Sequence, residues 1–138
     1  MLTPVQTLSY VIVLCDDIDR MKKFYRDLFS FPVDSETDES LALRVGSVLL
    51  GLRKRTRDYD GHGGGPESPG LQLAFLVSPA EVDECYEVLQ TKGVRILDPP
   101  ADQLRGHRTV YFADPEGNIL EVYAELSETS RDGPAATC

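Results

Sequence analysis

The chain has 138 residues, 41% of them apolar and 27% charged, which fits one globular domain or two closely packed halves. Its net charge of −9 and pI near 4.6 disfavour nucleic acid and anionic lipid as partners. No apolar run approaches the roughly 18 residues of a membrane span, and no signal-peptide pattern opens the chain. We therefore expect a cytoplasmic protein. Cys15, Cys85 and Cys138 have no paired spacing, and we assign them no chemistry.

The first half of the chain alternates strand and helix signals. Residues 8–14 are apolar and rich in β-branched side chains, which predicts a strand. Asp16 and Asp17 suit a helix N-terminus, and apolar residues at helical spacing over 18–29 predict an amphipathic helix. The rest of this half is predicted to contain an extended segment at 31–33, an acidic turn at 34–39, and strands at 41–45 and 48–52.

Residues 54–70 have the composition of a linker, since they are rich in glycine and lack apolar periodicity. This segment separates two modules, at about 8–53 and 71–126, within a single domain spanning 1–138. The polar tail, 127–138, is predicted to be disordered.

The second half repeats the pattern of the first. Residues 71–77 predict a strand, and Ser78, Pro79 and Glu81 combine an N-cap, a first-turn proline and a capping-box acid. The helix that follows ends at Gly93. The chain then continues with a short strand at 94–97, a loop at 99–107, and a hairpin at 110–124 whose turn is 114–118.

Two successive βαβββ modules predict an α+β fold, in which the sheets form a curved mixed-sheet cup with the helices outside. Alternate strand residues would face into the cup. This set is mostly apolar with a few polar groups, as in small-molecule sites. It contains Tyr10, Ile12, Leu14, Leu49, Gly51, Gln72, Ala74, Leu76, Ile119, Glu121 and Tyr123.

Glu121 is the polar residue that breaks the second arm of the hairpin. Strand alternation places it on the opposite face from Leu120 and Val122. It either lies on a solvated outer face or points into a cavity as a ligand-binding carboxylate.

The motifs of this chain resemble those of the vicinal oxygen chelate superfamily, which includes glyoxalases, bleomycin-resistance proteins, extradiol dioxygenases and fosfomycin-resistance enzymes. The resemblance rests on the duplicated βαβββ order and on three motifs. These are Asp17-Ile18 at the helix start, Phe-Tyr-Arg-Asp-Leu at 24–28, and Phe-Ala-Asp-Pro-Glu-Gly-Asn at 112–118 followed by Glu121.

The resemblance implies four metal-ligand positions facing the cup, two from each module. They fall on Tyr10, Gly51, Gln72 and Glu121. Only Gln72 and Glu121 offer usable ligands, because glycine has no side chain and neutral tyrosine binds divalent cations poorly. We therefore expect no cofactor, with a divalent metal on Gln72 and Glu121 as the alternative.

Two loop residues are candidate ligand contacts. His107 and Arg108 lie in the predicted loop before the hairpin, near where a pocket rim would be. Arg105 and Arg108 are either solvated or a clamp for an anionic group. His62 lies in the linker and is predicted to be solvated.

The resemblance favours a metal-free binding protein of the bleomycin-resistance kind over an enzyme. It would sequester a small aromatic or cationic molecule, such as an antibiotic, in the cup. The predicted ligand-binding residues are Tyr10, Ile12, Gly51, Gln72, Ala74, His107, Arg108, Glu121 and Tyr123.

Two alternatives remain open. One is a metal-dependent lyase, isomerase, thiol transferase or dioxygenase, or a metal-free enzyme with Glu121 as its general base. The other is a regulatory domain whose cup is filled by its own side chains or by a second subunit. The resemblance also implies a homodimer, in which the pocket can be shared between subunits.

Overall fold

The computed structural model describes residues 1–127 of the chain. Residues 128–138, which include Cys138 and nearly all of the predicted disordered tail, lie outside the described residues. Within residues 1–127, no helix is both long enough and apolar enough to cross a membrane.

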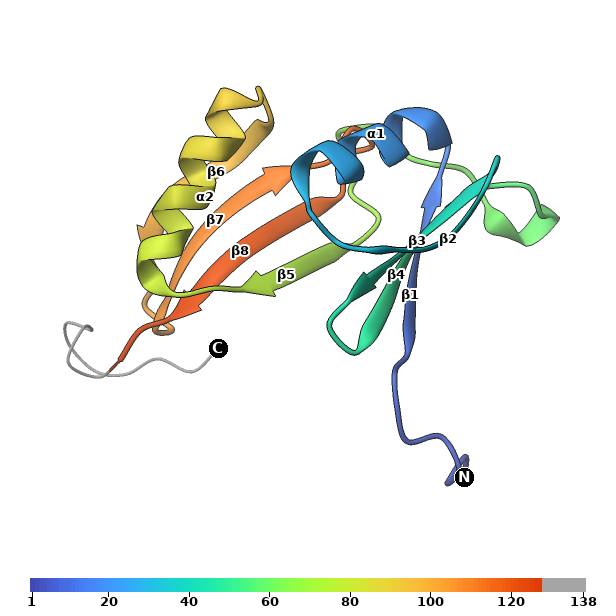
Figure 1. Ribbon diagram of the computed structural model, residues 1–138, viewed down its shortest axis with the longest axis horizontal. Helices are drawn as coiled ribbons and strands as arrows, with labels where there is room; N and C mark the ends of the chain where they lie inside the picture. Colours follow the sequence, from blue (N-terminus) through green and yellow to red (C-terminus); the bar gives the residue numbers. More distant parts are fainter. Residues whose placement is uncertain (128–138) are drawn as a thin grey trace. The chain divides into compact units, whose positions relative to one another are not determined.

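The chain folds as two compact units that meet in sequence at Gly63 and Gly64 (Figure 1). In the first unit the sheet order is β1-β4-β3-β2, with β1 and β4 parallel and the other pairs antiparallel. Its elements are β1 (Tyr10–Cys15), α1 (Ile18–Leu28), β2 (Val33–Thr37), β3 (Ser40–Val45), β4 (Val48–Lys54) and the 3₁₀ helix η1 (Asp58–Asp60).

The second unit repeats this topology, with sheet order β5-β8-β7-β6 and a parallel β5–β8 pair. The α+β class and the tandem βαβββ order are therefore confirmed. Its elements are β5 (Gln72–Leu76), α2 (Pro79–Thr91), β6 (Arg95–Asp102), β7 (His107–Ala113) and β8 (Ile119–Glu125).

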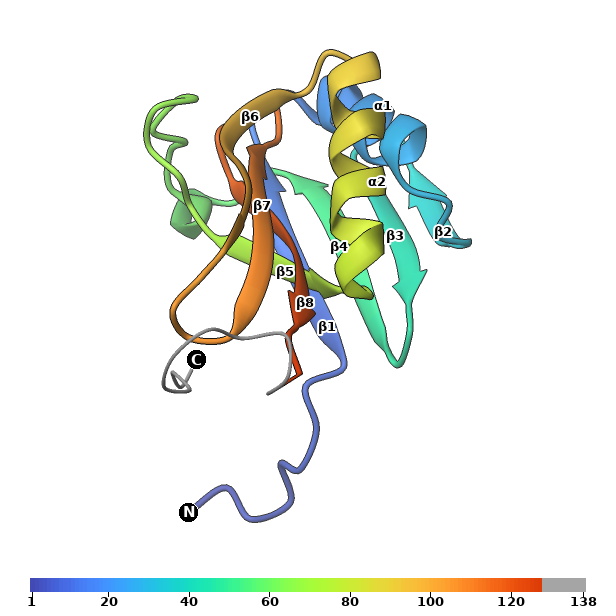
Figure 2. The same cartoon turned by 90° about the vertical axis from the view of Figure 1, so that its left-hand side faces the viewer.

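Each helix covers one face of its own sheet and buries the apolar residues of that face. Figures 1 and 2 show α2 along the second sheet, whose Phe112 and Leu120 are at most 1% exposed. The predicted caps are present, since Asp17 accepts from the Arg20 amide at 3.2 Å and Glu81 accepts from the Ser78 amide at 2.9 Å. Both helices therefore begin where local sequence chemistry places them.

The acidic segment predicted as a turn is the edge strand β2, with the turn confined to residues 38–39. Glu36 on β2 accepts hydrogen bonds from Lys22, at 3.1 Å, and from Arg26 of α1. These cations hold the pKa of Glu36 below its usual value. An edge strand tolerates exposed charge on both faces. The sequence of β2 therefore lacks the alternation of apolar and polar residues by which a strand is usually predicted.

The predicted loop at 99–107 is also wrong, because β6 extends to Asp102 and β7 begins at His107. The prolines at 99 and 100 lie where the β6–β7 register shifts, between Asp98 and Ala101. Proline is accommodated on an edge strand at such an irregularity, because no ladder hydrogen bond from its nitrogen is required.

The predicted linker is anchored at two places. Near its start, Asp60 accepts hydrogen bonds from Arg53 at 3.0 and 2.8 Å and from the amides of Thr56 and Arg57. Near its end, Gly70 donates to Asn118, and Arg95 donates to the Pro66 carbonyl. Only the middle of this segment therefore has the character of a connection between units.

Candidate functional site

Each sheet has an open face, by which we mean the face opposite its helix. On β1 the open-face residues Tyr10 and Ile12 are 41% and 48% exposed, whereas Val13 and Cys15 on the helix side are at most 1% exposed. On β5 the exposed residues alternate in the same way. The cup-facing sets predicted for the strands of each module therefore do share one face of their own sheet.

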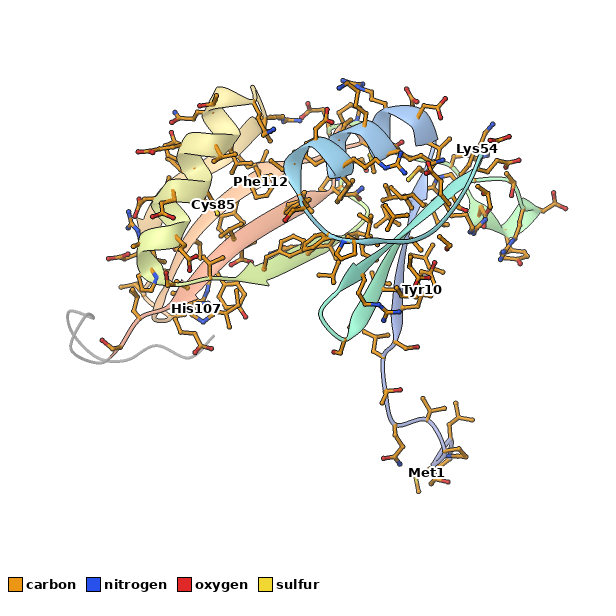
Figure 3. The ribbon with its side chains drawn as sticks, viewed as in Figure 1. Met1, Tyr10, Lys54, Cys85, His107 and Phe112 are labelled. Carbon is orange, nitrogen blue, oxygen red and sulfur yellow. The ribbon has the colours of Figure 1, made fainter. Side chains whose placement is uncertain are left out.

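Tyr10 and Gly51 are packed together on the open face of the first module (Figure 3 labels Tyr10). A Cβ atom added to Gly51 would lie 2.5 Å from Cε1 of the Tyr10 ring and 3.2 Å from its hydroxyl. The ring therefore fills the volume that a side chain at position 51 would need. The two positions form an aromatic wall, and neither presents a strong metal ligand.

Gln72 and Glu121 are joined on the open face of the second module. The Gln72 amide donates to Glu121 Oε1 at 3.1 Å, from β5 to the neighbouring strand β8. The Glu121 side chain is only 9% exposed. The solvated outer-face alternative for this carboxylate is therefore wrong, since a buried carboxylate needs partners such as this amide.

Arg105 provides the positive charge beside Glu121. Its Nη2 lies 3.7 Å from Glu121 Oε2, and the same nitrogen donates to the Tyr111 hydroxyl. Tyr111 and Glu121 are direct cross-strand partners, so the three side chains share the open face. The sequence predicted that Arg105 is either solvated or a clamp for an anionic group, and no local motif marked its pairing with Glu121.

His107 and Tyr123 add an aromatic pair to this open face. Their ring centroids are 4.8 Å apart with a 31° tilt between the rings. His107 is the first residue of β7 and not part of a loop, and its position on the strand brings it beside Tyr123. Figure 3 labels His107 at this end of the sheet.

Arg108 does not belong with the other predicted site residues. It follows His107 on β7 and therefore points to the opposite face, toward α2. There it donates to Asp83 at 3.1 and 2.7 Å and to Asp102 at 2.9 Å. These carboxylates raise the pKa of Arg108, and the Arg108 guanidinium in turn lowers the pKa of Asp83. Arg108 ties a helix to its sheet, and its predicted place at the pocket rim was wrong.

The residues at the family's metal positions do not fit a divalent cation. In the first module, the Tyr10 ring takes the volume next to Gly51, which carries no donor. In the second module, Gln72 turns its amide N–H toward Glu121, and a guanidinium already lies beside the carboxylate. Residues 1–127 contain no group of three or more His, Cys, Asp or Glu side chains arranged to hold a metal.

Comparisons with known proteins agree with this architecture. A family model described as the Glyoxalase/Bleomycin resistance protein/Dioxygenase superfamily matches residues 7–122. The metallothiol transferase FosB of Staphylococcus saprophyticus is 24% identical over 86% of this chain and 77% of its own length.

Two solved structures have the same fold. A glyoxalase/bleomycin resistance protein/dioxygenase from Nocardioides aligns with a TM-score of 0.78 and 23% identity over 94% of this chain and 89% of its own. The fosfomycin resistance protein FosX from Listeria monocytogenes aligns with a TM-score of 0.70 and 19% identity, over 92% and 99% of the two chains.

Proposed function

The chain belongs to the Glyoxalase/Bleomycin resistance protein/Dioxygenase superfamily, and on that premise we propose that it is a metal-free protein that binds a small, planar organic molecule. The ligand lies on the open face of a module, as that face is defined above. Sequestration of such a molecule, for example an antibiotic, is the biological role that we propose. The protein acts as a cytoplasmic homodimer.

One observation carries the proposal. Where metal-using relatives are expected to place ligands, the first module has a tyrosine ring over a glycine, and the second has a carboxylate paired with an amide and a guanidinium. Such a surface lacks a full set of metal ligands but has aromatic faces and a few fixed polar groups. This combination is typical of sites that bind planar organic compounds.

The alternative is a metal-dependent enzyme, and it is favoured by the likeness to a protein named metallothiol transferase. A metal-dependent enzyme requires metal-binding side chains from the first module, which Tyr10 and Gly51 do not offer. Glu121 is also poorly suited to general-base work, because its side chain is only 9% exposed and is held between Gln72 and Arg105. Binding without chemistry is therefore the function that we put forward.

The test is a thermal-shift screen of planar aromatic compounds, run with and without a chelator and accompanied by elemental analysis of the purified protein. We expect ligands whose effect survives chelation and is lost in Tyr10→Ala or Tyr123→Ala. Tyr59→Ala is the matched control, because Tyr59 is 79% exposed and lies on η1 and not on a strand of either sheet. Stoichiometric metal that disappears in Glu121→Ala would instead support the enzyme.

A further inference from the structure

The open face of the second module contains a carboxylate whose charge is already balanced. Glu121 is 9% exposed as a side chain, and the Arg105 guanidinium lies 3.7 Å from its Oε2. Its other oxygen, Oε1, accepts from Gln72 at 3.1 Å. A cationic ligand would have to displace or oppose Arg105 in order to reach Glu121.

Arg105 itself is accessible from this face. Its side chain is 35% exposed, and its Nη2 donates to the Tyr111 hydroxyl, which orients the guanidinium on the sheet surface. The ring of Tyr123 lies on the same face, tilted against the ring of His107. Arg105 is therefore the accessible charge beside the buried Glu121, whereas the exposed Glu125 lies farther along β8, opposite His107.

We infer that Arg105 selects the ligand by charge: the site takes a planar aromatic compound that presents an oxygen acceptor, as a carbonyl or carboxylate, to the guanidinium. The flat part of the ligand lies against Tyr123. This inference rests on the proposed binding function and names its ligand class. It also replaces the cationic ligand expected from the acidic sequence, because a guanidinium at contact distance acts on a bound group more strongly than the screened net charge of the chain does.

The experiment uses three probes of nearly the same shape and different charge, namely benzoate, benzamide and benzamidinium. Binding to the full chain is followed by NMR chemical-shift titration at about 0.15 M salt, where screening over roughly 8 Å suppresses the effect of net charge. For the wild type we expect benzoate and benzamide to bind, and benzamidinium to bind about tenfold more weakly or not at all.

Arg105→Gln should reverse this order, because Glu121 then lacks its nearby cation and benzamidinium gains a partner. Arg105→Met serves as a second variant in case the glutamine bonds to Glu121. Arg108→Gln is the matched control: it removes the same charge from the opposite face of the same sheet and should leave the order unchanged. The thermal unfolding midpoint of each variant reports whether it is folded.

The inference would be overturned if the wild type bound benzamidinium more tightly than the other probes. It would also be overturned if Arg105→Gln and Arg105→Met left the order of probe affinities unchanged. Absence of binding by all three probes at millimolar concentration would also overturn it. The proposed function is decided separately by the chelator-resistant screen, so charge selection can fail while small-molecule binding stands.

Discussion

The ring of Tyr10 lies over Gly51 and occupies the space that any side chain at position 51 would need. The two residues are on neighbouring parallel strands, with Ile12 rather than Tyr10 directly opposite Gly51. The ring therefore reaches diagonally across the sheet. The present position of the Tyr10 ring and a side chain at position 51 therefore exclude each other.

Gly51→Ala is expected to lower the free energy of unfolding by about 1 kcal/mol, the low end for overpacking, because the partly exposed Tyr10 ring can rotate away. Urea unfolding of Gly51→Ala, Tyr10→Ala and the double variant measures the coupling. We expect the double variant to be more stable than the sum of the single effects predicts. Simple additivity would contradict the contact.

Gly117→Ala is expected to be more damaging than Gly65→Ala. Both glycines have positive φ, +86° and +82°, so each alanine incurs a backbone cost of about 1 kcal/mol. At Gly117 the new Cβ would also lie 2.2 Å from the Pro66 carbonyl oxygen, whereas nothing lies within 4 Å at Gly65. We expect a loss of about 3 kcal/mol for Gly117→Ala, with faster hydrogen exchange in residues 64–70. Equal losses would exclude the backbone contact.

Asp60 should make stability depend on pH. Hydrogen bonds from Arg53 and from the Arg57 amide hold its pKa below the ordinary value of 3.8. A depressed pKa in the folded state stabilises the protein above the unfolded-state value, and this contribution fades as pH falls through the folded-state value. Asp60→Asn should therefore lower the urea midpoint at pH 7, and the difference from wild type should shrink below about pH 4. A constant difference down to pH 2 would argue against this pairing.

The pair formed by Arg108 and Asp83 should stabilise the attachment of α2 without affecting ligand binding. Because Asp83 is 52% exposed, we expect a coupling of about 0.5 to 1 kcal/mol in a double-mutant cycle of Arg108→Gln and Asp83→Asn. High salt should reduce it. The coupling should also vanish as Asp83, whose pKa is depressed, becomes protonated at low pH. A changed order of probe binding in Arg108→Gln would contradict its place on the helix face.

The sequence by itself determined the tandem βαβββ order, the helix starts and the motif turn. These depend on local chemistry. Asp17 and Ser78 cap their helices. Asp114 accepts hydrogen bonds from the backbone amides of Glu116 and Asn118 within its own turn. The faces of β1, β5 and β8 were also predictable, because a strand whose bounds are known has only two faces.

Only the tertiary structure decided the edge strands and the partners of Glu121. Strand β2 is paired with cations of α1, and the second part of β6 contains a register shift that accommodates its prolines, so neither β2 nor the extension of β6 beyond residue 97 has a local signal. The start of β7 at His107 fixes which side Arg108 faces, because moving one residue along a strand reverses the face. The pairing of Arg105 with Glu121 joins a turn to a strand that is distant in sequence. The composition of the chain gave only its net negative charge, and the fold places the Arg105 guanidinium beside Glu121.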